Sequence, residues 1–190
     1  MRKWVGAIAG LLLALASLLA TAPAFAQVTA AEHAAALEGL FAELKAAPDP
    51  ATAQMIADDI WSLWIEPPDA DLAARMSETL DLRWGGDIKA LISALDDIIA
   101  DYPDYAEGYN QRATVYFMLG NHEKSLADIA ATLEREPRHF GALAGRALIL
   151  REQGQYDRAL EDIRAALGIH PFLSERTLFP ELVEENEIQA

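Results

Sequence analysis

Histidine is the residue in this sequence best suited to metal binding or proton transfer near neutral pH. The chain has no cysteine and four histidines: His33, His122, His139 and His170. No two of them have the i, i+4 or short-loop spacing of a metal-binding pair. His122 also occupies the place that Tyr156 takes in a second copy of the same segment, which favours a packing role. We therefore expect no metal site and no cofactor.

Carboxylates are the second group that could carry chemistry, and acidic residues stand at positions 96, 97, 101, 104 and 107. A calcium loop needs oxygen ligands at alternate positions around a glycine bend, whereas Pro103 interrupts this segment. We interpret the run as a solvated acidic face. The sequence also contains no phosphate-binding glycine loop and no G-x-S-x-G motif. It predicts a non-catalytic protein, with a pair of carboxylates brought together by the fold as the catalytic alternative.

Two arginines and two aspartates recur at matching positions. Arg112 and Arg146 stand at equivalent places in the two copies, and Asp128 and Asp162 follow them at one and the same interval. An antiparallel hairpin would join each arginine to its own aspartate, or Arg146 to Asp128 across a repeat boundary. We predict structural ion pairs, with the arginine stems packed along the edge of the core. The functional alternative is that the arginines grip an acidic ligand.

The chain repeats itself with a period of about 34 residues, which is typical of helical repeat proteins. The segment NQRATVYFMLGNHEKSLADI at 110–129 returns as AGRALILREQGQYDRALEDI at 144–163. In each copy apolar residues at helical spacing flank a glycine, Gly120 or Gly154, and a proline follows the second run. Glycine permits the positive φ of a helix end, and proline cannot continue a helix interior. The pattern predicts one antiparallel helix pair in each copy.

This pattern resembles the tetratricopeptide repeat, a helix–turn–helix unit of the same length. The resemblance implies an all-α fold, a right-handed α-solenoid of antiparallel helix pairs with about three repeats. The first repeat is degenerate: Gly86 marks its turn, but Thr79 and Leu91 stand where small residues are expected. The predicted domain limits are a signal peptide at 1–26, an N-terminal helical pair or cap at 27–70, repeats at 71–105, 106–139 and 140–173, and an acidic C-terminal cap or tail at 174–190.

In this family the first helix of each repeat lines a concave surface that binds protein segments. Transferred position by position, the resemblance implies a protein- or peptide-binding surface of Met76, Leu80, Arg83, Trp84, Asn110, Thr114, Phe117, Met118, Leu148 and Arg151. Trp84, Phe117 and Met118 would form an exposed apolar patch, which commonly marks a binding site. The alternative is that these side chains pack under the N-terminal pair or the C-terminal tail. The basic residues with which one subset of the family grips a terminal carboxylate are absent, so an extended or helical segment with apolar anchors is expected.

The first residues have the layout of a secretory signal peptide. Arg2 and Lys3 precede an Ala/Leu-rich run that ends in Ala-Phe-Ala at 24–26. We expect cleavage after Ala26, a periplasmic location and no membrane insertion afterwards. The alternative is an uncleaved anchor, for which the apolar run is short. The chain also resembles exported tetratricopeptide proteins of alphaproteobacteria in the phrases DYAEGYNQRATVY and EPRHFGALAG.

The charge of the chain limits its partners. The formal charge is −15, and loss of two basic residues with the signal would make it −17. Such a field disfavours nucleic acid and anionic membrane surfaces. We predict a non-catalytic periplasmic scaffold that binds a peptide or protein segment in the concave groove. The alternative is an accessory subunit of an envelope assembly or quality-control complex, which would self-associate when isolated. A third hypothesis, an enzyme, needs a pocket of converging carboxylates with perturbed pKa values.

Overall fold

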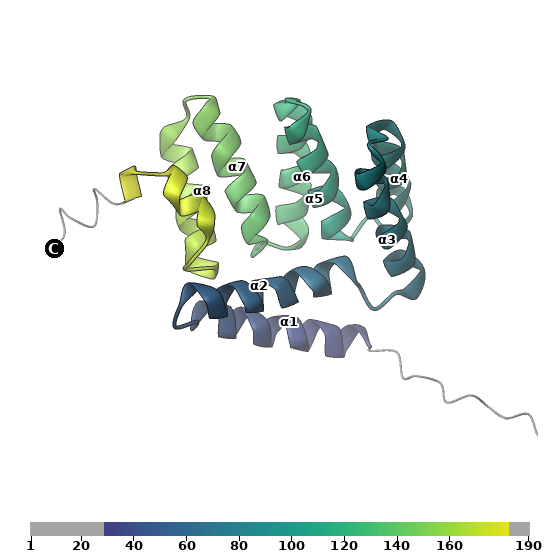
Figure 1. The fold of residues 1–190 in the computed structure, drawn as a ribbon, viewed down its shortest axis with the longest axis horizontal. Coiled ribbons are helices and arrows are strands. Elements are labelled where there is room, and N and C mark those ends of the chain that lie inside the picture. The colour runs from purple at the N-terminus through teal and green to yellow at the C-terminus, as the bar shows by residue number, and fades with distance from the viewer. Residues whose placement is uncertain (1–28, 183–190) are drawn as a thin grey trace, which may run out of the picture.

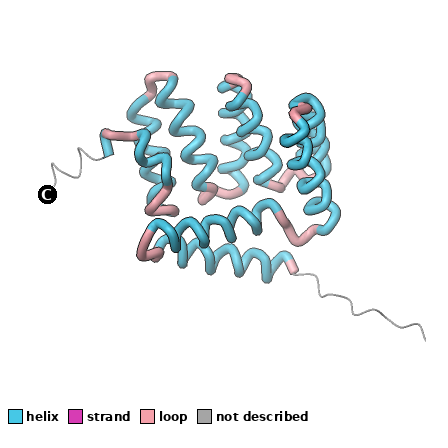
Figure 2. Tube along the Cα trace, in the orientation of Figure 1, coloured by secondary structure: helices cyan, strands magenta, loops and turns pink. Residues whose placement is uncertain are grey.

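The chain folds as a row of antiparallel helix pairs with one further pair lying across the row (Figure 1, Figure 2). The computed structural model describes residues 29–182, and the predicted signal peptide lies outside them. The described part contains eight α-helices and one short 3-10 helix. They are α1 (Ala30–Lys45), α2 (Pro50–Ile65), α3 (Ala70–Gly85), α4 (Ile88–Asp101), α5 (Ala106–Met118), α6 (His122–Arg135), α7 (Phe140–Glu152), α8 (Tyr156–Ile169) and η1 (Ser174–Leu178). The all-α fold of antiparallel helix pairs is confirmed.

The turns inside the three repeats end their first helices in the same way. Gly86, Gly120 and Gly154 have φ values of 73°, 69° and 74°, a region that side chains with a Cβ rarely adopt. After α5, the N–H of Asn121 donates to the carbonyl of Tyr116 at 2.8 Å, which is the closing bond of a Schellman motif. The turn glycines predicted from the repeat are therefore correct, including Gly86 in the degenerate copy.

Small residues allow the helices of each complete repeat to approach closely. Ala113, Ala147, Ser125 and Ala159 are all buried. The hydroxyl of Ser125 donates to the carbonyl of Ala113 at 2.9 Å, so it joins α6 directly to the backbone of α5. The first pair, α3 and α4, instead packs larger side chains, with Leu91 buried at the position that Ser125 holds in the next repeat.

The N-terminal pair, α1 and α2, does not extend the row as another layer. It runs across the row, close to the N-terminal ends of α5 and α7 (Figure 1). The Tyr105 hydroxyl, at the start of α5, donates to the carbonyl of Trp64 at 2.7 Å. Arg138, which precedes α7, binds Glu38 of α1 at 2.8 Å. The pair shares one apolar core with α7 and α8, in which Ile60 packs. This segment was expected to be a helical pair or a cap. It forms two helices, which pack against one side of the row.

The segment after α8 also packs onto the last repeat. Leu173 and Phe179 flank η1, and both are buried in the core that contains α7, α8 and the N-terminal pair. Among residues 29–182, no helix has both the length and the apolar composition that crossing a membrane requires.

Candidate functional site

The two predicted ion pairs are present, and each lies within one repeat. Arg112 donates to both carboxylate oxygens of Asp128, at 2.8 and 2.7 Å, and Arg146 does so to Asp162, at 2.7 and 2.6 Å. The hydrogen bonds that Arg112 donates to Asp128 raise the pKa of Arg112 above its usual value. Arg112 also binds Asp96 on the preceding pair at 2.6 Å, a bridge between repeats that the spacing did not predict. These arginines therefore hold helices together.

One repeat position of the predicted concave surface is buried in all three repeats. Met76, Asn110 and Ala144 occupy the same position in the three repeats, and all three are buried. Met76 is fully buried in the core between α3 and α4, against which Ile65 of α2 packs. The prediction that Met76 lines an open groove is wrong, because its side chain points into this core. Ala144 is buried in the core that includes Trp64 of α2.

A buried polar cluster fixes α2 to the row. Glu107 and His139 are 1% and 0% exposed, and their side chains meet at 3.0 Å. Asn110 donates to the Glu107 carboxylate at 3.1 and 3.2 Å, and Gln111 donates to it as well. Trp64 stacks on the His139 ring, with centroids 4.0 Å apart and planes inclined by 9°. Sequence reasoning missed this cluster, because Glu107 lies in the first turn of α5, His139 caps the N-terminus of α7, and no local pattern pairs them.

The two arginines predicted on the concave surface are held by neighbouring side chains. Arg83 donates to the side chain of Gln111. Arg151 binds Glu181 at 3.1 Å and lies over the ring of Phe179, with its guanidinium carbon 5.1 Å from the ring centroid. The C-terminal segment thus covers the part of α7 that carries Arg151.

Leu80 and Leu148 are half-buried and pack against the cores of the first and last repeats. The side chain of Trp84 lies outside the described part of the structure. Of the predicted surface residues whose side chains the structure describes, Thr114 and Met118 of α5 are the most open. Met118 is 70% exposed, Thr114 is exposed, and Phe117 is half-buried with its ring stacked on His122.

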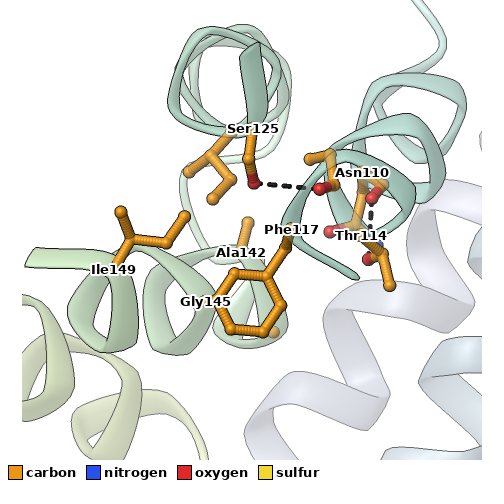
Figure 3. A pocket seen from close by; sticks show the side chains of 10 residues that line it. Asn110, Thr114, Phe117, Ser125, Ala142, Gly145 and Ile149 are labelled. Atoms are coloured by element: carbon orange, nitrogen blue, oxygen red, sulfur yellow. Dashed lines mark hydrogen bonds between the residues drawn. The ribbon is translucent and has the colours of Figure 1, made fainter. Parts of the chain in front are cut away.

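Thr114 and Phe117 border a cleft between α5, α6 and α7 (Figure 3). Its free volume is about 70 Å³. The lining residues come from these three helices: Asn110, Ala113, Thr114, Phe117, Ser125, Ile129, Gly141, Ala142, Gly145 and Ile149. The hydroxyls of Thr114 and Ser125 donate to backbone carbonyls within the protein, at 3.0 and 2.9 Å. The cleft therefore offers a mainly apolar surface to a ligand.

The absence of a side chain at Gly145 of α7 leaves space in the cleft. A Cβ atom placed on Gly145 would lie 3.7 Å from Cδ1 of Ile129, which is ordinary contact distance. An apolar cavity of about 150 Å³ binds benzene, so a space of about half that volume suits an aliphatic side chain better than a ring. Sequence reasoning noted that the basic residues of a carboxylate clamp are absent, but it did not predict a cleft beside Gly145.

Among residues 29–182, no group of three or more His, Cys, Asp or Glu side chains is arranged to hold a metal ion. The buried Glu107–His139 pair is shut off from solvent and lines none of the cleft. The lining of the cleft is thus mainly apolar, and the Glu107–His139 pair does not face it.

Sequence comparison with known proteins identifies the tetratricopeptide repeat in this chain. Residues 110–174 match the family model described as tetratricopeptide repeat. A TPR repeat-containing protein of Rhizobium etli is 38% identical over 141 residues, which are 71% of this chain and 66% of that protein. DnaJ homolog subfamily C member 3 of Bos taurus is 26% identical over 121 residues. The chain spans about two thirds of the Rhizobium protein and 24% of the bovine one. A crystal structure of MamA superposes with a TM-score of 0.48 at 21% identity, covering 72% of this chain and 88% of MamA.

Proposed function

The chain is a tetratricopeptide repeat protein, and on this premise we propose that it is a non-catalytic scaffold that binds a protein partner through the α5–α7 cleft. The observation that carries the proposal is this mainly apolar cleft, which Thr114 and Phe117 border and beside which Met118 is 70% exposed. Elsewhere on the predicted surface, Met76 is buried in the α3–α4 core, and Arg151 is bound to Glu181 of the C-terminal segment. The partner therefore contacts a short stretch of the surface.

The shape of the cleft indicates what the partner presents. The cleft takes one aliphatic side chain, and Phe117 and the exposed Met118 beside it provide apolar surface for the flanking residues. A partner segment that enters here is anchored by a leucine-, isoleucine- or valine-sized group, and its backbone can be extended or helical. Arg83 and Trp84 remain proposed outer contacts of the same surface.

We propose that this binding takes place in the periplasm after cleavage behind Ala26. The support is the basic, apolar and small-residue layout of 1–26. The test is N-terminal sequencing of the protein recovered from a periplasmic fraction. The proposal requires a mature chain that begins at Gln27, and a cytosolic chain that still begins at Met1 contradicts it.

Site-specific photo-crosslinking in living cells tests the binding site. A photoreactive amino acid at Met118, 70% exposed beside the cleft, should capture a partner. The matched control is Met55 on α2, which is 63% exposed and does not line the cleft. The variant Gly145→Leu fills the cleft and should abolish capture at Met118 while helicity by circular dichroism is unchanged. Capture of the same partner from both positions, or capture that survives Gly145→Leu, would exclude this cleft as the site.

A further inference from the structure

The α3–α4 end of the row carries a second surface with the features of an interface. Figure 1 shows α3 and α4 as one end of the row, with no further described helix stacked beyond them. A depression with a free volume of about 300 Å³ lies between the two helices. Its lining residues are Arg75, Glu78, Thr79, Leu82, Ala94, Asp97 and Ile98.

The inner repeats show how such a surface is normally covered. In the row, the second helix of one pair packs against the first helix of the next, and Arg112 of α5 reaches back to Asp96 of α4 at 2.6 Å. The repeat register, fixed by the turn glycines, places Glu78 of α3 at the position of Arg112. It places Ala94 at the position of Asp128, so the end repeat lacks both members of the inner ion pair.

The end surface therefore carries the Glu78 carboxylate where an inner surface carries a guanidinium. Glu78 and Asp97 are exposed, and neither forms an ion pair with any residue in 29–182. The nearby Arg75 is already bound to Asp101 at 2.8 Å.

The charge of the whole N-terminal half adds to this local pattern. Residues 29–104 contain 16 acidic and four basic residues, whereas 105–182 contain eleven acidic and nine basic residues. Electrostatic attraction of a positively charged partner would therefore act mainly on the half of the molecule that contains α3 and α4.

We propose that the α3–α4 end binds a basic amphipathic helix of a partner protein, laid where the second helix of a preceding repeat would pack. The helix places a lysine or arginine opposite Glu78, at the position equivalent to Asp96, and apolar side chains over Leu82 and Ala94. A second copy of this chain fits poorly, because the charge of −15 opposes self-association and because Phe179 and its neighbours already pack on the last repeat. This surface is separate from the α5–α7 cleft, and binding here does not depend on it.

The probe is a peptide of residues 87–103, which contains α4, the helix that packs against α5 of the next repeat inside the row. The peptide carries Asp96→Arg, Asp97→Lys and Asp101→Lys. An isolated helix of this length is only marginally stable in water, so a lactam that joins Lys89 to a glutamate introduced by Ser93→Glu keeps the peptide helical. The comparison peptide is identical but keeps Asp96. Fluorescence anisotropy at low salt should show the peptide with Asp96→Arg binding the chain at least about fivefold tighter, and the preference should shrink as salt rises.

A charge swap makes the test specific to Glu78. In the Glu78→Arg variant the preference should reverse, so that the peptide with Asp96 binds tighter. Glu123→Arg changes the net charge equally but lies on α6, and it should keep the original preference. Failure of both peptides to bind, or a preference unchanged by Glu78→Arg, overturns the proposal. Sedimentation that shows a dimer of the chain, dissociated by Glu78→Arg, also overturns it by assigning the surface to a second copy.

Discussion

Replacing Gly141 with alanine would bring a methyl group against the N-terminal helix pair. A Cβ at this position lies 2.8 Å from two carbons of the Trp61 ring, well inside the van der Waals distance of about 3.5–4.0 Å. The ring has little room to move, because it packs edge-on against Trp64, His139 and Phe140 with centroid distances of 5.1, 5.3 and 5.5 Å. Gly145, one turn further along α7, meets nothing closer than 3.7 Å.

These distances give opposite expectations for the same substitution. Alanine is favoured over glycine in a helix by up to about 1 kcal/mol, so Gly145→Ala should raise the free energy of unfolding by about 0.5–1 kcal/mol. Gly141→Ala should give a smaller increase in the free energy of unfolding from helix propensity, because Gly141 lies in the first turn of α7. It also incurs an overpacking cost of about 1–3 kcal/mol. The Gly141 variant should therefore be less stable than the Gly145 variant by roughly 1–4 kcal/mol.

Urea denaturation followed by far-UV circular dichroism measures both free energies of unfolding. Trp61→Leu removes the ring that meets the new methyl group, so adding Gly141→Ala to Trp61→Leu should cost little more than Trp61→Leu alone. Equal stability of Gly141→Ala and Gly145→Ala would refute the reasoning. It would mean that the N-terminal pair does not pack against the start of α7.

Three further outcomes follow from the packing. Arg146→Leu should lower the free energy of unfolding by about 1–3 kcal/mol, because it leaves the Asp162 carboxylate without its partner. Adding Asp162→Leu should restore part of this loss in urea denaturation. A double variant that does not fold would contradict a structural role for the ion pair. Phe179→Ala should cost about 3–5 kcal/mol, because the ring is fully buried, and a loss below about 1 kcal/mol would show that the C-terminal segment does not support the last repeat. Burial lowers the pKa of His170 in the folded state, so the unfolded state binds the proton more readily and stability should fall as pH drops from about 7 to 5. His170→Gln should flatten this part of the stability–pH curve, and an unchanged slope would remove His170 as its cause.

The helix pairs could be predicted because the signals that specify them are local. Gly120 and Gly154 end helices through their own backbone angles, and the apolar spacing on either side needs only the helix period. The pairs Arg112–Asp128 and Arg146–Asp162 were also accessible, since one hairpin with a fixed turn brings the two members of each pair together.

The binding surface was harder to predict, because it depends on where distant segments lie. Met76 has the spacing of a concave residue, yet it is buried in the α3–α4 core beside Ile65 of α2. Trp64 of the N-terminal pair stacks on His139 at the N-terminus of α7, and no local pattern encodes that contact.

By itself, then, the sequence determined the repeat unit, its helix ends and its internal ion pairs, since each of these is set within about 34 residues by backbone geometry and hydrogen bonding. Only the tertiary structure decided which part of the concave surface stays open. The N-terminal pair buries its large side chains against α7 and α8, and it reaches them only by crossing the row. The hydrophobic effect is non-directional, so the sequence alone does not show which distant segments will bury apolar area together. Those contacts can be read only from the folded chain.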